Sequence, residues 1–369
     1  MSGPTVAPYG SWTSPIKAED IASGTLGLGE IELGVDCAYW LELRPAEGGR
    51  YVIVRWTPGG ISDVIPPPFN ARTRVHEYGG GAYLPVGEAV IFAHFDDQRL
   101  YRAVAGRTPE PITPESDMRY ADGVVDGRRN RLICVREDHT HGGEPINAIV
   151  VIDLDAPGAG AVLAGGSDFY AAPRLSPDGT ELAWLSWRHP AMPWDSAELH
   201  VAGVLADGAL GSPRHVAGSS EESVVQPEWS PDGTLHFVSD RSNWWNLYRL
   251  VDGEVRAVAP MEAEFAGPLW RFRPSTYAFD GAGGIVCTYR RDGVSTLARV
   301  DPGAGRVEDI DTPFNDIRSL RVAGEWAWFV GGSGAEPVAV VRLNLAGGDV
   351  EIVRRACELP VDRAYVSPP

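Results

Sequence analysis

The sequence has 369 residues, of which 44% are hydrophobic and 22% are charged, so it can bury a large core and is neither disordered nor fibrous in type. Its formal net charge of −18 would repel phosphate backbones and anionic lipid surfaces, which argues against nucleic acid or a membrane as a partner. The 43 glycines and 30 prolines interrupt the chain too often for long helices, while Val, Trp, Tyr and Thr recur in short runs between them. These features favour an all-β fold.

The first residues carry no targeting signal of the secretory type. Residues 1–20 lack a basic start followed by an apolar stretch, and no later run approaches the roughly 18 apolar residues of a membrane span. The cytoplasm is therefore the expected location.

A turn-and-strand unit recurs along the chain. Ser176-Pro177-Asp178-Gly179-Thr180 precedes the apolar run 182–185, and Ser230-Pro231-Asp232-Gly233-Thr234 precedes the apolar run 235–238. Proline presets φ at the first corner of such a turn, aspartate bonds the local backbone, and glycine takes the positive φ that closes a hairpin. Looser versions of the same turn precede apolar runs at 89–92, 131–134, 285–288 and 326–329.

The spacing of these units predicts a seven-bladed β-propeller with four antiparallel strands in each blade, and six or eight blades are the alternatives. The blades are predicted at residues 29–68, 69–114, 115–166, 167–220, 221–262, 263–313 and 314–356. The N-terminal segment 1–28 and a proline-containing, linker-like tail 357–369 lie outside this count. How the ring closes is left open.

Longer strings then indicate a family. Residues 74–83 (RVHEYGGGAY), 189–195 (HPAMPWD) and 239–249 (SDRSNWWNLYR) resemble the propeller of the S9, prolyl-oligopeptidase-type serine peptidases, in the branch of dipeptidyl aminopeptidases and acylaminoacyl-peptidases. Segments 136–147 and 262–268 look like the same branch. The resemblance implies that an α/β-hydrolase domain carrying the Ser, Asp and His triad follows the propeller, and this sequence stops about where that domain would begin.

No catalytic residue is predicted within the sequence itself. The nearest approach to a G-x-S-x-G nucleophile elbow is residues 331–335, GGSGA, which ends in alanine and lies after a predicted strand, where a hairpin turn is expected instead. Without a nucleophile, base and oxyanion hole, acyl transfer by the usual triad is not expected.

No metal or other cofactor is predicted either. His139 and His141 have a spacing that can bind a metal, but they stand beside two glycines with no third ligand motif nearby. The four cysteines are far apart and form no C-x-x-C pair.

One candidate binding region is His76-Glu77-Tyr78, which lies in the longest match to the family. Glu77 could meet a peptide amine or a hydrolase loop at the propeller face. The three glycines that follow support the alternative that this segment serves tight backbone packing at the start of a blade.

The other candidate binding residues lie in two further segments. Trp194 and Asp195 occupy a proline-containing loop, where an exposed aromatic side chain can contact substrate or a second domain. Glu262 and Glu264 lie between blades and could bind a peptide α-amine, or else be solvated or paired with a neighbouring arginine such as Arg271 or Arg273. Arg271 is itself a candidate binding residue.

Three hypotheses for function follow. The first is that the chain is the non-catalytic propeller of an S9 peptidase, which restricts access to short peptides and holds an α/β-hydrolase domain. The second is a stand-alone propeller that acts as a binding or scaffold protein. The third is a stand-alone propeller with its own chemistry in the channel, using carboxylates such as Glu77 or Glu264 as acid or base.

Overall fold

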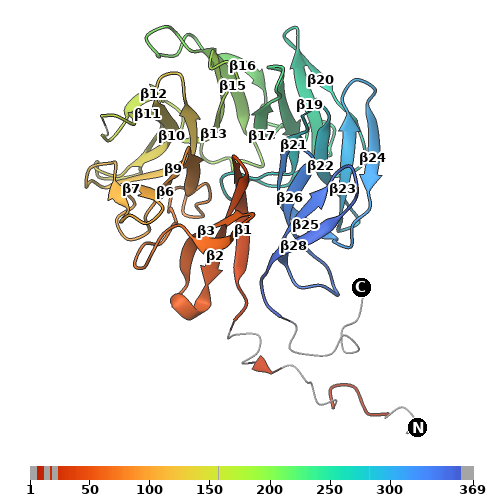
Figure 1. The fold of residues 1–369 in the computed structure, drawn as a ribbon. Coiled ribbons are helices and arrows are strands. Elements are labelled where there is room, and N and C mark those ends of the chain that lie inside the picture. The colour runs from red at the N-terminus through yellow and green to blue at the C-terminus, as the bar shows by residue number, and fades with distance from the viewer. Residues whose placement is uncertain (1–5, 12–16, 19–23, 157, 282, 359–369) are drawn as a thin grey trace.

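The chain forms a ring of seven four-stranded antiparallel sheets (Figure 1). The computed structural model describes residues 6–11, 17–18, 24–156, 158–281 and 283–358. The seven-bladed propeller predicted from the repeats is confirmed, and the alternatives of six and eight blades are wrong. Much of the predicted segment 1–28, and the predicted tail 357–369 apart from its first two residues, lie outside the described residues.

Each blade is built from four consecutive strands. Blades 1 to 3 contain β1 (Gly27–Gly34), β2 (Cys37–Arg44), β3 (Arg50–Thr57), β4 (Gly60–Asp63), β5 (Tyr83–Val86), β6 (Ala89–Ala93), β7 (Leu100–Val104), β8 (Glu110–Pro111), β9 (Met118–Asp126), β10 (Arg131–Asp138), β11 (Ile146–Asp153) and β12 (Ala161–Ala164), with a 3-10 helix η1 (Pro45–Glu47) in blade 1. Blades 4 and 5 contain β13 (Phe169–Leu175), β14 (Glu181–Trp187), β15 (Glu198–Gly203), β16 (Arg214–Ala217), β17 (Val224–Trp229), β18 (Leu235–Ser239), β19 (Asn246–Val251) and β20 (Glu254–Ala257). Blades 6 and 7 contain β21 (Tyr277–Phe279), β22 (Ile285–Arg291), β23 (Val294–Asp301), β24 (Arg306–Ile310), β25 (Asp316–Ala323), β26 (Trp326–Gly332), β27 (Ala339–Asn344) and β28 (Val350–Arg355). None of the described helical segments is long and apolar enough to cross a membrane.

Burial decreases from the middle of each blade to its outer edge. The second strand β10 is buried at every position, whereas the fourth strand β4 is exposed at every position. The first strands of neighbouring blades contact one another and therefore surround the axis of the ring. The apolar runs in the sequence thus become the inner strands, and polar runs become the outer edge.

The two Ser-Pro-Asp-Gly-Thr turns have the predicted structure. In the turn between β13 and β14, the Asp178 carboxylate accepts hydrogen bonds from the hydroxyls of Ser176 and Thr180, each at 2.7 Å. Gly179 has φ of +67°, and its N–H donates to the Ser176 carbonyl at 2.8 Å. Local side-chain chemistry therefore closes this hairpin, as the sequence indicated.

The ring closes where blade 1 packs against blade 7, and the described residues exchange no strand between these blades. Arg342 of blade 7 lies between the rings of Trp56 of blade 1 and Trp326 of blade 7, with its guanidinium carbon 4.5 Å from each ring centroid. Glu42 of blade 1 is fully buried and accepts a hydrogen bond from Arg354 of blade 7 at 2.8 Å. These contacts between blades 1 and 7 form the seam of the ring. They show how the ring closes, which the sequence did not predict.

Candidate functional site

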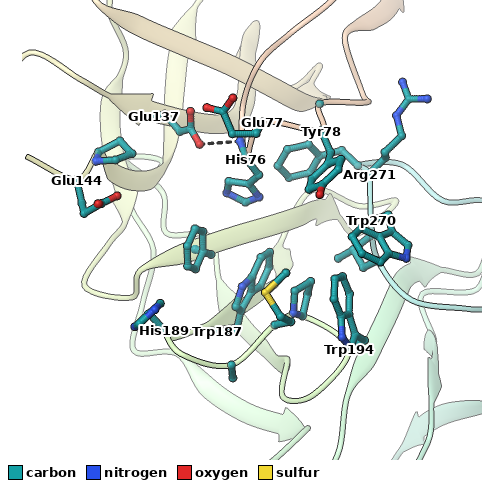
Figure 2. A pocket seen from close by; sticks show the side chains of 18 of the residues that line it. His76, Glu77, Tyr78, Glu137, Glu144, Trp187, His189, Trp194, Trp270 and Arg271 are labelled. Carbon is teal, nitrogen blue, oxygen red and sulfur yellow. Dashed lines mark hydrogen bonds between the residues drawn. The ribbon is translucent and has the colours of Figure 1, made fainter.

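A cavity of about 360 Å³ opens on one face of the propeller (Figure 2). Its walls come from the connections β4–β5 and β20–β21 between blades, from the loops β10–β11 and β14–β15 within blades with the strand ends beside them, and from Phe169 at the start of β13. Connections of these two kinds emerge on the same side of an antiparallel blade, and we call this side the cavity face. The site is therefore built from loops held in place by a rigid ring.

The wall from the β4–β5 connection is shaped by unusual backbone. His76 and Glu77 have φ of +52° and +63°, and the three glycines that follow all have positive φ. A Cβ on Gly80 would stand 2.7 Å and 2.8 Å from the main-chain O and N of Phe272, so only glycine allows this approach. The predicted tight backbone packing is confirmed, and it places His76-Glu77-Tyr78 against the β20–β21 connection.

Aromatic side chains from the connections β4–β5 and β20–β21, from the end of β14 and the loop after it, and from the start of β13 form most of the cavity wall. The ring centroids of Trp194 and Trp270 are 4.3 Å apart, and those of Tyr78 and Trp270 are 5.4 Å apart. Phe169 and Trp187 stack at 5.4 Å on the other side. Such a surface suits a flat apolar group, because aromatic walls offer large contact area with defined geometry.

Carboxylates border this aromatic surface. Glu137 is buried, and it accepts hydrogen bonds from the His76 main-chain N–H at 2.7 Å and from His139 Nε2 at 3.1 Å. Glu77 and Glu144 are exposed, and Glu77 forms an ion pair with Arg119 at 3.1 Å. The buried carboxylate holds the loop, whereas Glu144 and the ion-paired Glu77 bring exposed carboxylates to the edge of the cavity.

The imidazole of His76 packs among three of the aromatic rings. Its centroid is 4.7 Å from that of Phe272, 5.2 Å from Phe169 and 5.4 Å from Trp187. Burial lowers the pKa of His76 to about 4, against opposing effects of Asn147 and Asp122. The imidazole is therefore neutral at pH 7.

The cavity brings together five of the eight residues singled out in the sequence: His76, Glu77, Tyr78, Trp194 and Arg271. The other three do not line it. Asp195 accepts a hydrogen bond from the Met192 main chain at 3.0 Å, Glu264 accepts one from the Trp245 main chain at 2.8 Å, and Glu262 is exposed.

Sequence reasoning missed Phe169, Trp187 and Trp270, which contribute much of the aromatic surface. Trp270 adjoins the candidate Arg271 in the sequence, and this position could have indicated it as a site residue. Phe169 and Trp187 lie at the start of β13 and the end of β14, where apolar residues are expected in any blade.

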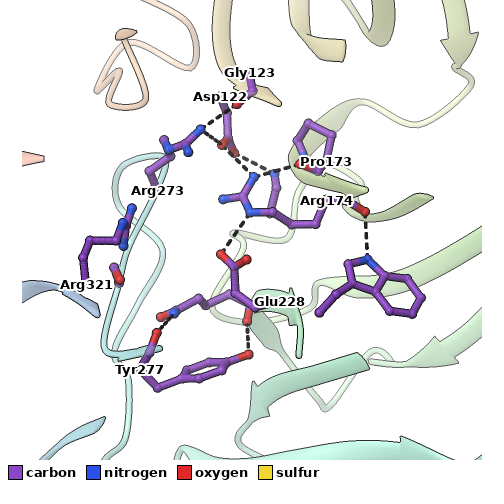
Figure 3. A network of polar contacts seen from close by, with 12 residues as sticks. Asp122, Gly123, Pro173, Arg174, Glu228, Arg273, Tyr277 and Arg321 are labelled. Atoms are coloured by element: carbon purple, nitrogen blue, oxygen red, sulfur yellow. Dashed lines mark hydrogen bonds and ion pairs between the residues drawn. The ribbon is translucent and has the colours of Figure 1, made fainter. Parts of the chain in front are cut away.

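A second cluster of charged side chains lies at the axis, and we call it the axial belt (Figure 3). Arg174 of β13 binds Asp122 of β9 and Glu228 of β17, both at 3.0 Å. Glu32 of β1 binds Arg273 at 2.8 Å and Arg321 of β25 at 3.0 Å. The belt is composed of Glu32, Asp122, Arg174, Glu228, Arg273 and Arg321.

Arg273 connects the two parts of the belt across the axis. It precedes β21 of blade 6, and its Nη1 donates to the Gly123 carbonyl of blade 3 at 2.6 Å. Blades 3 and 6 are three positions apart, which is the greatest separation possible in a ring of seven. The β20–β21 connection carries Arg273 across the axis, because Phe272 before it already donates a main-chain hydrogen bond to the Gly79 carbonyl, just before blade 2.

The electrostatics of the belt favour its charged form. Burial alone would raise the pKa of Glu32, but the guanidinium groups of Arg273 and Arg321 outweigh it and lower the pKa to about 2. The neighbouring carboxylates Asp122 and Glu228 raise the pKa of Arg174 in spite of its burial. Neither Glu77 nor Glu264, the carboxylates considered for chemistry in the channel, takes part in the belt.

Comparison with solved structures places this ring in a known class, that of peptidase propellers. The structure of a puromycin-hydrolysing peptidase from Mycobacterium tuberculosis is 37% identical with a TM-score of 0.93, and the match covers 99% of this chain and 59% of that one. Puromycin hydrolase is 35% identical with a TM-score of 0.90, and the match covers 98% of this chain and 58% of that one. This chain thus spans less than two thirds of the length of these structures.

A structure from a study of two prolyl endopeptidases supports the fold alone, at 12% identity and a TM-score of 0.69, with 92% of this chain and 51% of that one covered. No protein-family model matches the chain, and neither does any curated protein. The matches to the two puromycin-hydrolysing enzymes identify the chain as a β-propeller of the prolyl-oligopeptidase-type (S9) family of serine peptidases.

Proposed function

We propose that this chain is the non-catalytic propeller portion of an S9 serine peptidase, and that its cavity face docks an α/β-hydrolase domain. The observation that carries the proposal is the aromatic cavity, which lies on the face where loops from several blades converge. In this arrangement the cavity receives an apolar or aromatic side chain of a short peptide or aminoacyl substrate, and the hydrolase domain supplies the triad.

The chemistry of the cavity supports a substrate of this kind. Its aromatic walls suit a flat side chain, and the exposed carboxylates Glu77 and Glu144 at the rim suit a positively charged α-amine nearby. The two similar solved proteins are named for hydrolysis of puromycin, and a mutant of puromycin hydrolase was solved in complex with PGG. Aminoacyl and short peptidyl compounds are therefore the proposed substrates, and assignment to the dipeptidyl aminopeptidase or acylaminoacyl-peptidase branch is part of the proposal.

We further propose that the axial belt restricts access through the ring. The β20–β21 connection carries Arg273 across the axis, where it is paired with Glu32 and with the Gly123 carbonyl, so opening this route requires breaking both contacts. A peptide would then reach the cavity from the cavity face rather than through the axis.

Hydrolysis of a panel of aminoacyl- and dipeptidyl-p-nitroanilides tests this function. The chain is assayed alone and mixed with a separately expressed hydrolase domain encoded at its own locus. Activity only in the mixture is the expected result. Activity of the chain alone would contradict the non-catalytic role, and the absence of activity in both would favour a stand-alone binding protein.

A further inference from the structure

The aromatic cavity contains one neutral polar ring whose hydrogen-bonding direction the structure fixes. This ring is the imidazole of His76, which lies among Phe169, Trp187 and Phe272 at the cavity wall (Figure 2). Because the imidazole is neutral, one ring nitrogen carries a hydrogen and the other is an acceptor. Which nitrogen is the acceptor decides what the cavity can bind.

Asn147, at the beginning of β11, determines the position of the hydrogen. Its Nδ2 donates to the Asp168 carbonyl at 2.8 Å, so its amide oxygen must point elsewhere. That oxygen and Nε2 of His76 are both buried, and neither forms a regular hydrogen bond with the described residues. The Asn147 amide nevertheless raises the pKa of His76 against the effect of burial, as a hydrogen-bond acceptor does. A hydrogen on Nε2 that points towards this amide oxygen accounts for the burial of both atoms and for the effect of Asn147 on the imidazole.

The other ring nitrogen, Nδ1, is left as an acceptor. Within the part of the chain that the structure describes, Nδ1 has no hydrogen-bond partner, yet it is not one of the buried unpaired atoms. It therefore keeps accessible surface, and the imidazole belongs to the cavity lining. An acceptor thus opens into a cavity whose other walls are largely apolar.

We propose that Nδ1 of His76 is a specificity-determining acceptor, and that the cavity selects aromatic side chains that carry a hydrogen-bond donor, with the tyrosine phenol as the natural ligand. This inference rests on the proposed function, because it assumes that the cavity receives a side chain. A phenylalanine side chain leaves Nδ1 unpaired when it displaces water from the cavity, whereas a phenol hydroxyl donates to it. An ammonium group would also donate, but the aromatic walls would not replace its hydration.

The test compares three probes that differ at one position of the ring: N-acetyl-L-tyrosinamide, its O-methyl ether and N-acetyl-L-phenylalaninamide. Each is titrated into the full chain at pH 7 by isothermal titration calorimetry. We expect the tyrosine probe to bind about three- to tenfold more tightly than the other two, which is the effect of one neutral hydrogen bond. Equal affinities for the three would overturn the role of Nδ1 while leaving the cavity as a side-chain site, whereas no binding of any probe would overturn the proposed function of the cavity.

Two variants assign the preference to particular residues. His76→Phe retains an aromatic ring but has no acceptor, so it should bind the phenylalanine probe as before and lose the preference for tyrosine. Trp194→Ala removes wall area without touching Nδ1, so it should weaken all three probes and keep the preference. A tyrosine preference that survives in His76→Phe would show that another group is the acceptor.

The position of the hydrogen is measured separately on the unsubstituted chain. ¹⁵N NMR of the labelled histidine ring distinguishes a protonated from an unprotonated nitrogen. We expect Nε2 to be protonated and Nδ1 unprotonated at pH 7. The opposite tautomer would overturn the proposal, even if His76→Phe fails to fold.

Discussion

Replacement of Glu32 by glutamine removes the charge that joins Arg273 and Arg321 in the axial belt. In the folded chain the pKa of Glu32 is lowered from 4.5 to about 2. A shift of this size corresponds to about 3 kcal/mol of stability, at about 1.4 kcal/mol for each pKa unit. For 369 residues, an unfolding entropy of about 2 cal/mol/K per residue converts this loss into a Tm lower by about 4 °C.

The sign of the pH dependence makes this prediction specific. A carboxylate whose pKa is lowered by folding contributes its full stabilisation above its unfolded pKa of 4.5, and it loses this contribution as the pH falls towards 2. The stability difference between the original chain and Glu32→Gln should therefore be large at pH 6 and should shrink progressively below pH 4.5.

Urea unfolding followed by tryptophan fluorescence, at a series of pH values, measures this difference. The control is Glu308→Gln, because Glu308 is 60% exposed and pairs with an exposed arginine, so its loss should cost less than about 1 kcal/mol. If the difference for Glu32→Gln stayed constant from pH 6 to pH 2.5, the charge of Glu32 would not be what stabilises the belt.

Three further substitutions test the cavity wall and the seam. Gly80→Ala should lower the free energy of unfolding in urea by about 3 kcal/mol, because the new Cβ would meet main-chain atoms of Phe272 at 2.7 Å and 2.8 Å and φ is +93°. A decrease of less than about 1 kcal/mol would mean that the two segments can move apart. Arg342→Ala should lower stability by about 1–2 kcal/mol through lost stacking on Trp56 and Trp326, which thermal unfolding measures, and an unchanged Tm would refute the role of this contact in closure. Trp194→Ala should weaken binding of N-acetyl-L-phenylalaninamide by about fivefold with little change in Tm, since its ring contacts Trp270 in the cavity wall; unchanged affinity would place the ligand elsewhere.

The fold could be predicted from the sequence because its signals are local. A turn such as 176–180 depends on side chains within five residues of each other, and the apolar run after it needs no distant information to form a strand. The count of blades follows from repetition of this unit. Closure could not be predicted, because Arg342 and Trp56 meet only when the ring is complete.

The candidate site was predicted in part. His76 stood out through a family string and Arg271 as a possible ion-pair partner of Glu262 and Glu264, and the structure brings their segments together by the approach of Gly80 to Phe272. Asp195 and Glu264 stood out equally well, but both are used in local hydrogen bonds to the main chain. The sequence shows which residues are candidates for a site. Whether their side chains point into the cavity or back to the main chain depends on the conformation of the loop backbone.

The axial belt gave no sequence signal for a physical reason. Five of the first strands contain a residue with positive φ at a β-bulge, but these residues have no common chemistry: Glu30, Asp122, Ala172, Gln226 and Ser319. In four of these strands the charged belt residue lies two positions later, at Glu32, Arg174, Glu228 and Arg321. The repeated element is a backbone distortion, and a sequence pattern does not reveal it.

The way the ring closes has a topological consequence. Every blade uses consecutive strands, and the main-chain N–H of Leu26, just before blade 1, donates to the carbonyl of Ala356, just after blade 7, at 2.8 Å. The point where the chain enters the ring is thus adjacent to the point where it leaves. A circular permutant that joins residues 26 and 356 and opens the chain between two other blades would keep all seven sheets intact, so the order of the blades around the axis, rather than the position of the chain break, defines this fold.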